Sequence, residues 1–179
     1  MFSGKSLELI CRAKSARDDG LTVCAAVAVV GREARHHIVS HAGTRLAATS
    51  VSDPIELFSV ARGHDVVLID EAQFLDREVI DVVDALVCKG ARVVVAGLDL
   101  DFRGEPFGFM AELMRLADRV DHLTAVCSRC GARATLTQRL REGVPVPLAD
   151  PVIDLGSEGY EPRCERCFHE ERSISAPPR

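Results

Sequence analysis

Met1-Phe2-Ser3-Gly4-Lys5-Ser6 opens the chain and matches the last six residues of the pattern G-x-x-x-x-G-K-[ST]. In that pattern backbone N–H groups and the Lys surround the phosphates of a nucleotide, and the Ser or Thr hydroxyl binds Mg²⁺. A helical pattern follows, and the positive end of that helix dipole would face the same anion. The stretch therefore predicts a P-loop α/β fold in which four residues contact the phosphates: Ser3, Gly4, Lys5 and Ser6.

The first Gly of the pattern would lie two residues before Met1, and the strand that normally precedes the loop is absent from the sequence. We therefore expect either that the true start lies upstream or that the chain is truncated, with an impaired site. Loss of a central strand leaves buried backbone groups unpaired, which costs about 1–3 kcal/mol for each group. A chance Gly-Lys-Ser at a disordered terminus is the alternative interpretation.

Composition excludes several classes of protein. The 179 residues suffice for one domain of ordinary size and a small appendage, and 47% of them are hydrophobic. No apolar run approaches the ~18 residues of a membrane span, and no signal peptide precedes the first helical pattern. The net charge of −5 argues against nonspecific binding to a nucleic acid polymer. We expect a cytoplasmic protein with no membrane or nucleic acid partner.

Apolar runs alternate with amphipathic stretches over residues 1–126, which is typical of a parallel sheet with flanking helices. Asp53-Pro54 has the residues of a helix start, with Asp as N-cap and Pro in the first turn. Asp76 is the expected cap of a later helix. Helices are expected over residues 7–16, 54–63, 77–89 and 109–116, and strands over 22–30, 65–69, 91–97 and 120–126.

Asp70-Glu71 follows directly on the apolar residues 65–69. Ligands of open α/β sheets bind at the carboxyl ends of the strands, where an acidic side chain of P-loop proteins helps to hold Mg²⁺. The pattern predicts Asp70 and Ser6 as magnesium ligands, and Glu71 as a general base that accepts a proton from a substrate hydroxyl. Two exposed loop charges are the alternative.

Four of the seven cysteines form a C-x₂-C…C-x₂-C pattern. Four thiolates suit a closed tetrahedral zinc site with a structural role, and the long gap between the pairs predicts a loop, or lasso, whose base the zinc holds. A redox pair is the alternative. The expected zinc ligands are Cys127, Cys130, Cys164 and Cys167.

The remaining cysteines, Cys11, Cys24 and Cys88, fall in periodic apolar segments and are expected in the core. The change of pattern after residue 126 predicts three parts. They are a P-loop nucleotide-binding domain over 1–126, a small C-terminal zinc-binding lasso domain over 127–172, and a flexible tail over 173–179.

These motifs together resemble the type II thymidine kinase family, whose members combine a phosphate loop with a zinc-held lasso. The resemblance extends from Met1 to about Phe168. Besides the two Cys pairs, the segments that carry it are M-F-S-G-K-S at 1–6, D-E-A-Q-F at 70–74, G-L-D-L-D-F-R-G-E-P-F at 97–107 and T-L-T-Q-R at 135–139.

The resemblance implies a transferase that moves the γ-phosphoryl group of ATP to the 5′-hydroxyl of thymidine, with deoxyuridine as a second candidate acceptor. The products would be dTMP and ADP, in pyrimidine salvage for DNA biosynthesis. Glu71 would be the base that deprotonates the acceptor hydroxyl, and Mg²⁺ would accompany ATP. The resemblance also implies a homotetramer and feedback inhibition by thymidine triphosphate.

Nucleoside contacts follow from the same resemblance. An apolar pocket would surround the base and sugar, and lasso residues would hold the pyrimidine edge and close over the nucleoside. Arg32 resembles a family Arg, which implies that it either approaches phosphate or supports its loop. The implied nucleoside-binding residues are Met1, Phe74, Leu98, Phe102, Phe107, Thr137, Val152, Ile153 and Tyr160.

Two further positions depart from the family pattern. Val30 stands where the family usually has Asp, two residues before the Arg that Arg32 matches, and Ser157 stands where the lasso usually has Gly. If the backbone at 157 needs a positive φ, Ser is strained there. A truncated, non-catalytic zinc-ribbon and P-loop remnant that acts through protein contacts is the alternative function. Another P-loop ATPase or kinase with a different acceptor is the second rival.

Overall fold

The computed structural model describes residues 1–30, 35–153 and 159–175, with side chains up to residue 171. Its contacts divide the chain into two compact units. The sheet unit consists of Gly4–Asp99 and Phe107–Asp121, and the cysteine unit of Met1–Ser3, Leu100–Pro106 and His122–Arg179. The domain boundary expected after residue 126 stays a prediction.

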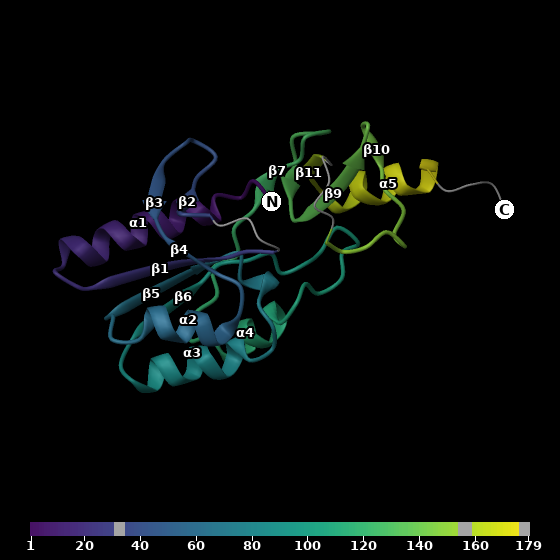
Figure 1. Cartoon of the computed structure of the whole chain (residues 1–179). Helices are drawn as coiled ribbons and strands as arrows, with labels where there is room; N and C mark the ends of the chain where they lie inside the picture. Colours follow the sequence, from purple (N-terminus) through teal and green to yellow (C-terminus); the bar gives the residue numbers. More distant parts are fainter. Residues whose placement is uncertain (31–34, 154–158, 176–179) are drawn as a thin grey trace. The chain divides into compact units, whose positions relative to one another are not determined.

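A four-stranded parallel sheet forms the centre of the sheet unit, in the order β4-β1-β5-β6 (Figure 1). Strand β5 is buried along its whole length and pairs with β1 on one side and β6 on the other. Its apolar residues are β-branched or Leu, as a buried parallel strand requires. The strands are β1 (Val23–Ala28), β4 (Thr49–Val51), β5 (Val66–Asp70) and β6 (Arg92–Val95).

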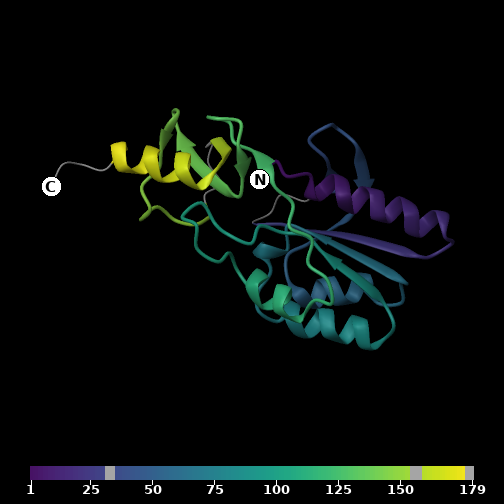
Figure 2. The ribbon, with the colours of Figure 1, turned by 180° about the vertical axis from the view of Figure 1, so that it is seen from behind.

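Both faces of this sheet are covered, as Figures 1 and 2 show from opposite sides. On one face α1 (Lys5–Asp18) and the hairpin of β2 (His37–Val39) and β3 (Arg45–Ala47) pack against Val66 and Leu68. On the other face Val67 and Ile69 pack against three helices. Alternate residues of one strand thus serve two cores. The three helices are α2 (Pro54–Ala61), α3 (Val79–Cys88) and α4 (Met110–Leu116).

This arrangement confirms the predicted fold class of a parallel sheet with flanking helices. The start of α2 is also as expected, because the Asp53 side chain accepts a hydrogen bond from the Glu56 N–H at 2.9 Å and Pro54 occupies the first turn. The expected cap at Asp76 is wrong. Its backbone carbonyl accepts the Val79 N–H at 3.0 Å in a turn before the helix, and Glu78 is the cap residue.

Two further expectations are corrected. No strand spans residues 120–126; only β7 (Ala125–Val126) forms, and it pairs antiparallel with β8 (Arg133–Ala134) outside the parallel sheet. Cys24 is buried as expected, but Cys11 and Cys88 are exposed. On α1 the buried positions are Leu9, Ala13 and Ala16, and Cys11 does not share their face.

The cysteine unit contains less regular structure. A three-stranded antiparallel sheet in the order β10-β9-β11 lies beside the β7–β8 hairpin and is followed by a helix. No helix in the described part of the chain is both long enough and apolar enough to cross a membrane. The remaining elements are β9 (Leu136–Arg141), β10 (Val144–Pro145), β11 (Gly159–Arg163) and α5 (Glu165–Ser175).

Candidate active site and metal centre

The amino end of α1 has the geometry of an anion-binding helix start. Gly4 is its cap residue, with φ 88° and ψ 11°, a left-handed conformation that favours glycine. Lys5 and Ser6 are the first two helical residues, so their N–H groups belong to the first turn and have no partner within the helix. Free N–H groups and the positive end of the dipole together favour a phosphate at this position.

Ser6 faces the carboxyl end of β5. Its hydroxyl donates a hydrogen bond to Asp70 Oδ2 at 3.0 Å, and the Glu71 N–H donates to Asp70 Oδ1 at 3.0 Å. The two oxygen-bearing side chains expected to hold Mg²⁺ therefore lie within hydrogen-bond distance, although 64 positions separate them in the sequence. Hydroxyl and carboxylate oxygens are the ligands that Mg²⁺ prefers.

Asp70 is only 3% exposed. Burial raises the pKa of its carboxyl group above the ordinary value and the Glu71 carboxylate adds to this, while the Ser6 hydroxyl, the Glu71 N–H and the Lys5 charge act in the opposite direction. A buried acid with a raised pKa gains from a nearby cation, because the cation favours the ionised form. The residues around Asp70 thus fit a divalent metal ion.

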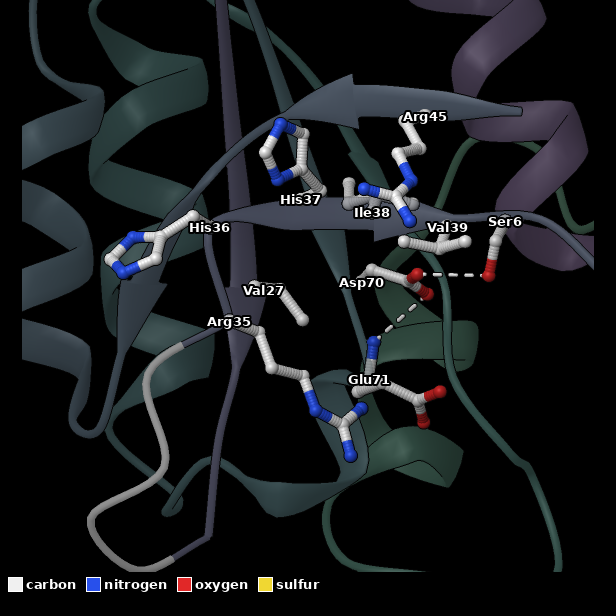
Figure 3. A pocket seen from close by; sticks show the side chains of 10 residues that line it. All are labelled: Ser6, Val27, Arg35, His36, His37, Ile38, Val39, Arg45, Asp70 and Glu71. Carbon is white, nitrogen blue, oxygen red and sulfur yellow. Dashed lines mark hydrogen bonds between the residues drawn. The ribbon is translucent and has the colours of Figure 1, made fainter. Parts of the chain in front are cut away.

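A cavity of about 400 Å³ opens beside Ser6, Asp70 and Glu71 (Figure 3). Basic side chains provide much of the rest of its wall, so carboxylates and cations share one cavity. The other lining residues are Val27, Arg35, His36, His37, Ile38, Val39 and Arg45. Lys5 is not among the lining residues.

The sequence analysis missed Arg35 and Arg45. Arg45 lies on the outward face of the β2–β3 hairpin, opposite Val39, while Ile38 and Leu46 point into the core. Neither arginine forms an ion pair within the described residues. Exposure alternates only at 37–40 and 45–47, and the exposed Val39 is apolar, so the sequence offered little signal for either arginine. Arg32, which the family resemblance favoured instead, lies outside the described residues.

Glu71 occupies a left-handed backbone conformation, with φ 57° and ψ 34°, directly before the short helix η1 (Ala72–Phe74). The Gln73 amide donates a hydrogen bond from Nε2 to Glu71 Oε2 at 2.6 Å, and its Oε1 accepts the Leu98 N–H at 3.1 Å. Gln73 was not among the predicted site residues. Its place in the D-E-A-Q-F segment, two residues after Glu71, was the only sequence signal.

The predicted nucleoside residues fall in both units. In the sheet unit the rings of Phe74 and Phe107 meet edge to face, with centroids 5.6 Å apart, and Leu98 is held at its N–H by Gln73. Met1 and Thr137 meet in the cysteine unit, where the Met1 nitrogen donates to Thr137 Oγ1 at 2.9 Å.

Phe102, also in the cysteine unit, is only 3% exposed and lies against the guanidinium of Arg139, which is 4.7 Å from the ring centroid. Arg139 is itself fully buried and donates to the Pro151 carbonyl at 2.6 Å. Pro151 directly precedes Val152 and Ile153, so this hydrogen bond holds the backbone next to two of the predicted nucleoside residues. On β11, Tyr160 pairs with Arg139, and Ser157 lies outside the described residues.

The four cysteines predicted as metal ligands form a cluster, with every Sγ within 4.8 Å of the others. Zn–S bonds of ~2.3 Å in a tetrahedron place sulfurs about 3.8 Å apart, so the cluster can hold a metal such as zinc. Cys127 and Cys130 lie in the β7–β8 turn, where Gly131 has φ 76°. Cys164 precedes α5 and Cys167 lies in its first turn.

The thiols of this cluster differ in acidity. Burial raises the pKa of Cys127, but backbone hydrogen bonds from Cys164, Arg129 and Cys130 together lower it to about 6. Burial and hydrogen bonding to the neighbouring cysteines raise the pKa of Cys167 to about 12. Four thiolates this close repel one another, so full ionisation needs a bound cation. This chemistry is that of a metal centre.

A family model described as thymidine kinase matches residues 1–168. The match covers the helix start at Lys5, the acids at the end of β5 and the four clustered cysteines. Members of this family are phosphotransferases, and their substrates are ATP and thymidine. The chain therefore belongs to the thymidine kinase family.

Proposed function

We propose that the protein transfers the γ-phosphoryl group of ATP to the 5′-hydroxyl of thymidine, giving dTMP and ADP. The observation that carries the proposal is the contact of Ser6 with Asp70 at the edge of a cavity that Glu71 also lines. This arrangement joins a helix start suited to phosphate, a pair of oxygen ligands and a candidate base. Family membership supplies the substrates.

The triphosphate is proposed to lie against the start of α1. The N–H groups that follow Gly4 and the ammonium of Lys5 contact phosphate oxygens, with Ser3 at the edge of the loop. Ser6 and Asp70 hold Mg²⁺, which when bound neutralises charge on the phosphates. Arg45 adds a cation from the cavity wall.

Glu71 is proposed to accept the proton of the 5′-hydroxyl as that oxygen attacks the γ-phosphorus. The new P–O bond forms while the bond from the γ-phosphorus to the bridging oxygen breaks, and ADP leaves with the electron pair. Contacts to thymidine are proposed for Phe74, Leu98 and Phe107 in the sheet unit. In the cysteine unit they are proposed for Met1, Phe102, Thr137, Val152, Ile153 and Tyr160.

An assay of ADP release with thymidine, with deoxyuridine and without nucleoside tests the proposal. Thymidine-dependent release, with dTMP detected as product, supports it, and the deoxyuridine arm measures how strictly the acceptor base is selected. Release that is independent of nucleoside indicates an ATPase. No release in any arm, from a folded protein loaded with zinc and Mg²⁺, favours the non-catalytic remnant and rejects the kinase.

A further inference from the structure

The Gln73 side chain connects the candidate base to the segment after β6. Its Nε2 donates to Glu71 Oε2 at 2.6 Å, while its Oε1 accepts the Leu98 N–H at 3.1 Å. The backbone N–H of Leu98 can only donate, so it requires the amide oxygen on its side. The amide nitrogen must then face Glu71. The orientation of this amide is therefore set by its partners.

The surroundings of Gln73 prevent the side chain from turning away. Gln73 is 4% exposed. A Cβ at Gly97 would lie 2.8 Å from Gln73 Oε1, and a Cβ at Gly108 would lie 2.5 Å from the Gln73 carbonyl oxygen. Both distances are shorter than real Cβ contacts, so two glycines allow the chain to close around this residue. The Ala72 N–H also donates to the Ala96 carbonyl at 3.1 Å, which joins η1 to the end of β6.

Glu71 needs such support because its own environment restrains it little. It follows the last residue of β5 in a left-handed conformation, and its side chain lines an open cavity. Within the described residues, Gln73 is the side chain that hydrogen-bonds the Glu71 carboxylate. This bond occupies Oε2 and leaves Oε1 able to accept a proton from a substrate.

We propose that Gln73 is a positioning residue for phosphoryl transfer: it fixes the Glu71 carboxylate for proton abstraction and ties its orientation to the backbone at Leu98. The inference rests on the proposed function, because it assumes that Glu71 is the base. Gln73 itself touches no reacting atom. A base displaced by about 1 Å can lose on the order of 10²-fold in rate, so this link should act on the chemical step rather than on thymidine binding.

Two substitutions separate this role from support of the backbone at Leu98. Gln73→Glu keeps the shape and an acceptor for the Leu98 N–H but replaces the donor to Glu71 with a carboxylate. Gln73→Met keeps the volume approximately and removes both hydrogen bonds. Positioning of Glu71 predicts that both lower kcat by about 10- to 100-fold, and that Gln73→Glu, which keeps an acceptor for the Leu98 N–H, leaves the KM for thymidine within about threefold. Mere support of the Leu98 backbone predicts near-normal kcat for Gln73→Glu and a loss for Gln73→Met alone.

A double-mutant cycle tests whether the effect of Gln73 on kcat depends on Glu71, as a positioning role requires and a purely structural role does not. In a Glu71→Gln background no base remains to be positioned, so adding Gln73→Glu should change residual turnover by less than about twofold. Independent, multiplicative losses would overturn the inference. Lys89→Gln, at the exposed end of α3, changes the net charge by the same amount and serves as the matched control.

Failure of the inference and failure of the proposed function look different. If the unmodified protein does not phosphorylate thymidine, the proposed function fails and the inference falls with it. If it does so and Gln73→Glu retains kcat within about twofold, the inference alone is overturned. Thymidine binding measured by calorimetry should be unchanged in Gln73→Glu, with folding of the variant judged by thermal unfolding. If Gln73→Glu fails to fold, Gln73→Met is tested in the Glu71→Gln background instead: a further change in residual turnover of less than about twofold supports the inference, and a multiplicative loss overturns it.

Discussion

The sheet unit and the cysteine unit are held together by different physics. In the sheet unit two apolar clusters lie on opposite faces of a parallel sheet and together include buried residues from most of its helices and strands. The buried cluster of the cysteine unit is small, consisting of Cys127, Ala134 and Cys167. Its other fully buried side chains include Gln138 and Arg139, which are polar.

The contrast indicates that apolar burial suffices for one unit but not for the other. Burying a side chain such as Leu57 contributes about 1.5–3 kcal/mol, and the sheet unit has many such residues. A small unit with few apolar contacts usually depends on a metal or a disulfide. None of the seven cysteines forms a disulfide in this structure, and four of them form a cluster that could hold a metal such as zinc.

The largest expected difference between the two units follows removal of zinc from the cysteine cluster. Structural zinc contributes about 10–16 kcal/mol of apparent binding free energy in small domains. A strong chelator, or Cys164→Ser, should therefore unfold the cysteine unit while the parallel sheet persists. Hydrogen exchange should show protection lost in β9 and β11 and kept in β5. Cys88→Ser, at an exposed thiol, is the control and should retain zinc. Equal loss of protection in both units would contradict the contrast.

A substitution at Glu71 should greatly slow the chemical step without disturbing either unit. General base catalysis contributes typically 10²–10⁴-fold, so Glu71→Gln should lower kcat by about that factor. The phosphate-binding residues at the start of α1 are untouched, and ATP should still bind, as calorimetry would show. Turnover within about threefold of the unmodified protein would reject Glu71 as the base.

A cavity in the apolar core should test the stability of the sheet unit directly. Leu57 on α2 is fully buried against the sheet. Leu57→Ala should lower the free energy of unfolding by about 2–5 kcal/mol, from lost burial and the cavity left behind. Urea unfolding would measure the loss. Ile55→Ala on the same helix, where the side chain is 80% exposed, should have little effect. Zinc content should remain unchanged in both variants.

The smallest expected effect concerns pH. The Thr22 hydroxyl and N–H donate to Asp65 Oδ2 at 2.6 and 2.8 Å, and these hydrogen bonds lower the pKa of Asp65 below its ordinary value. A carboxyl group with a lowered folded-state pKa stabilises the fold above its unfolded pKa, and this stabilisation is lost as the pH falls through the folded value.

Asp65→Asn should therefore flatten the acid side of the stability profile of the sheet unit slightly. Urea midpoints measured between about pH 3 and pH 7 would show this, since the unfolded Asp pKa is about 3.9. Asp84→Asn, an exposed carboxylate on α3, is the matched control and should leave the slope unchanged. An equal change in slope for both variants would contradict the role of the Thr22 hydrogen bonds.

Much of the fold was predictable because it depends on local patterns. The apolar residues before Asp70 predicted a buried strand, and Asp53-Pro54 predicted the start of α2. The predicted cap at Asp76 failed because a turn places Glu78 at the helix start, which depends on backbone geometry rather than residue type. The strand expected over 120–126 was wrong. Only Ala125–Val126 pairs with another strand, and its partner is β8, next to the first pair of cysteines, rather than the parallel sheet.

The candidate site was predictable only in part. Ser6, Asp70 and Glu71 belong to motifs whose chemistry is recognisable from residue type and order, and the structure brings the first two within hydrogen-bond distance. Arg45 and Gln73 were missed because their roles depend on partners distant in sequence. Arg45 lines the cavity from the β2–β3 hairpin, and the Gln73 amide oxygen accepts the N–H of Leu98, 25 positions away.

The sequence by itself determined the alternation of helices and strands, the two cysteine pairs and the membership of a kinase family, because periodicity and motif spacing are local properties of the chain. Only the tertiary structure decided which groups from distant positions meet: the Gln73 amide with the Leu98 N–H, and the Arg139 guanidinium with the Phe102 ring and the Pro151 carbonyl. Such contacts arise when distant segments pack, and the pattern of one segment does not specify the partner that will cover it.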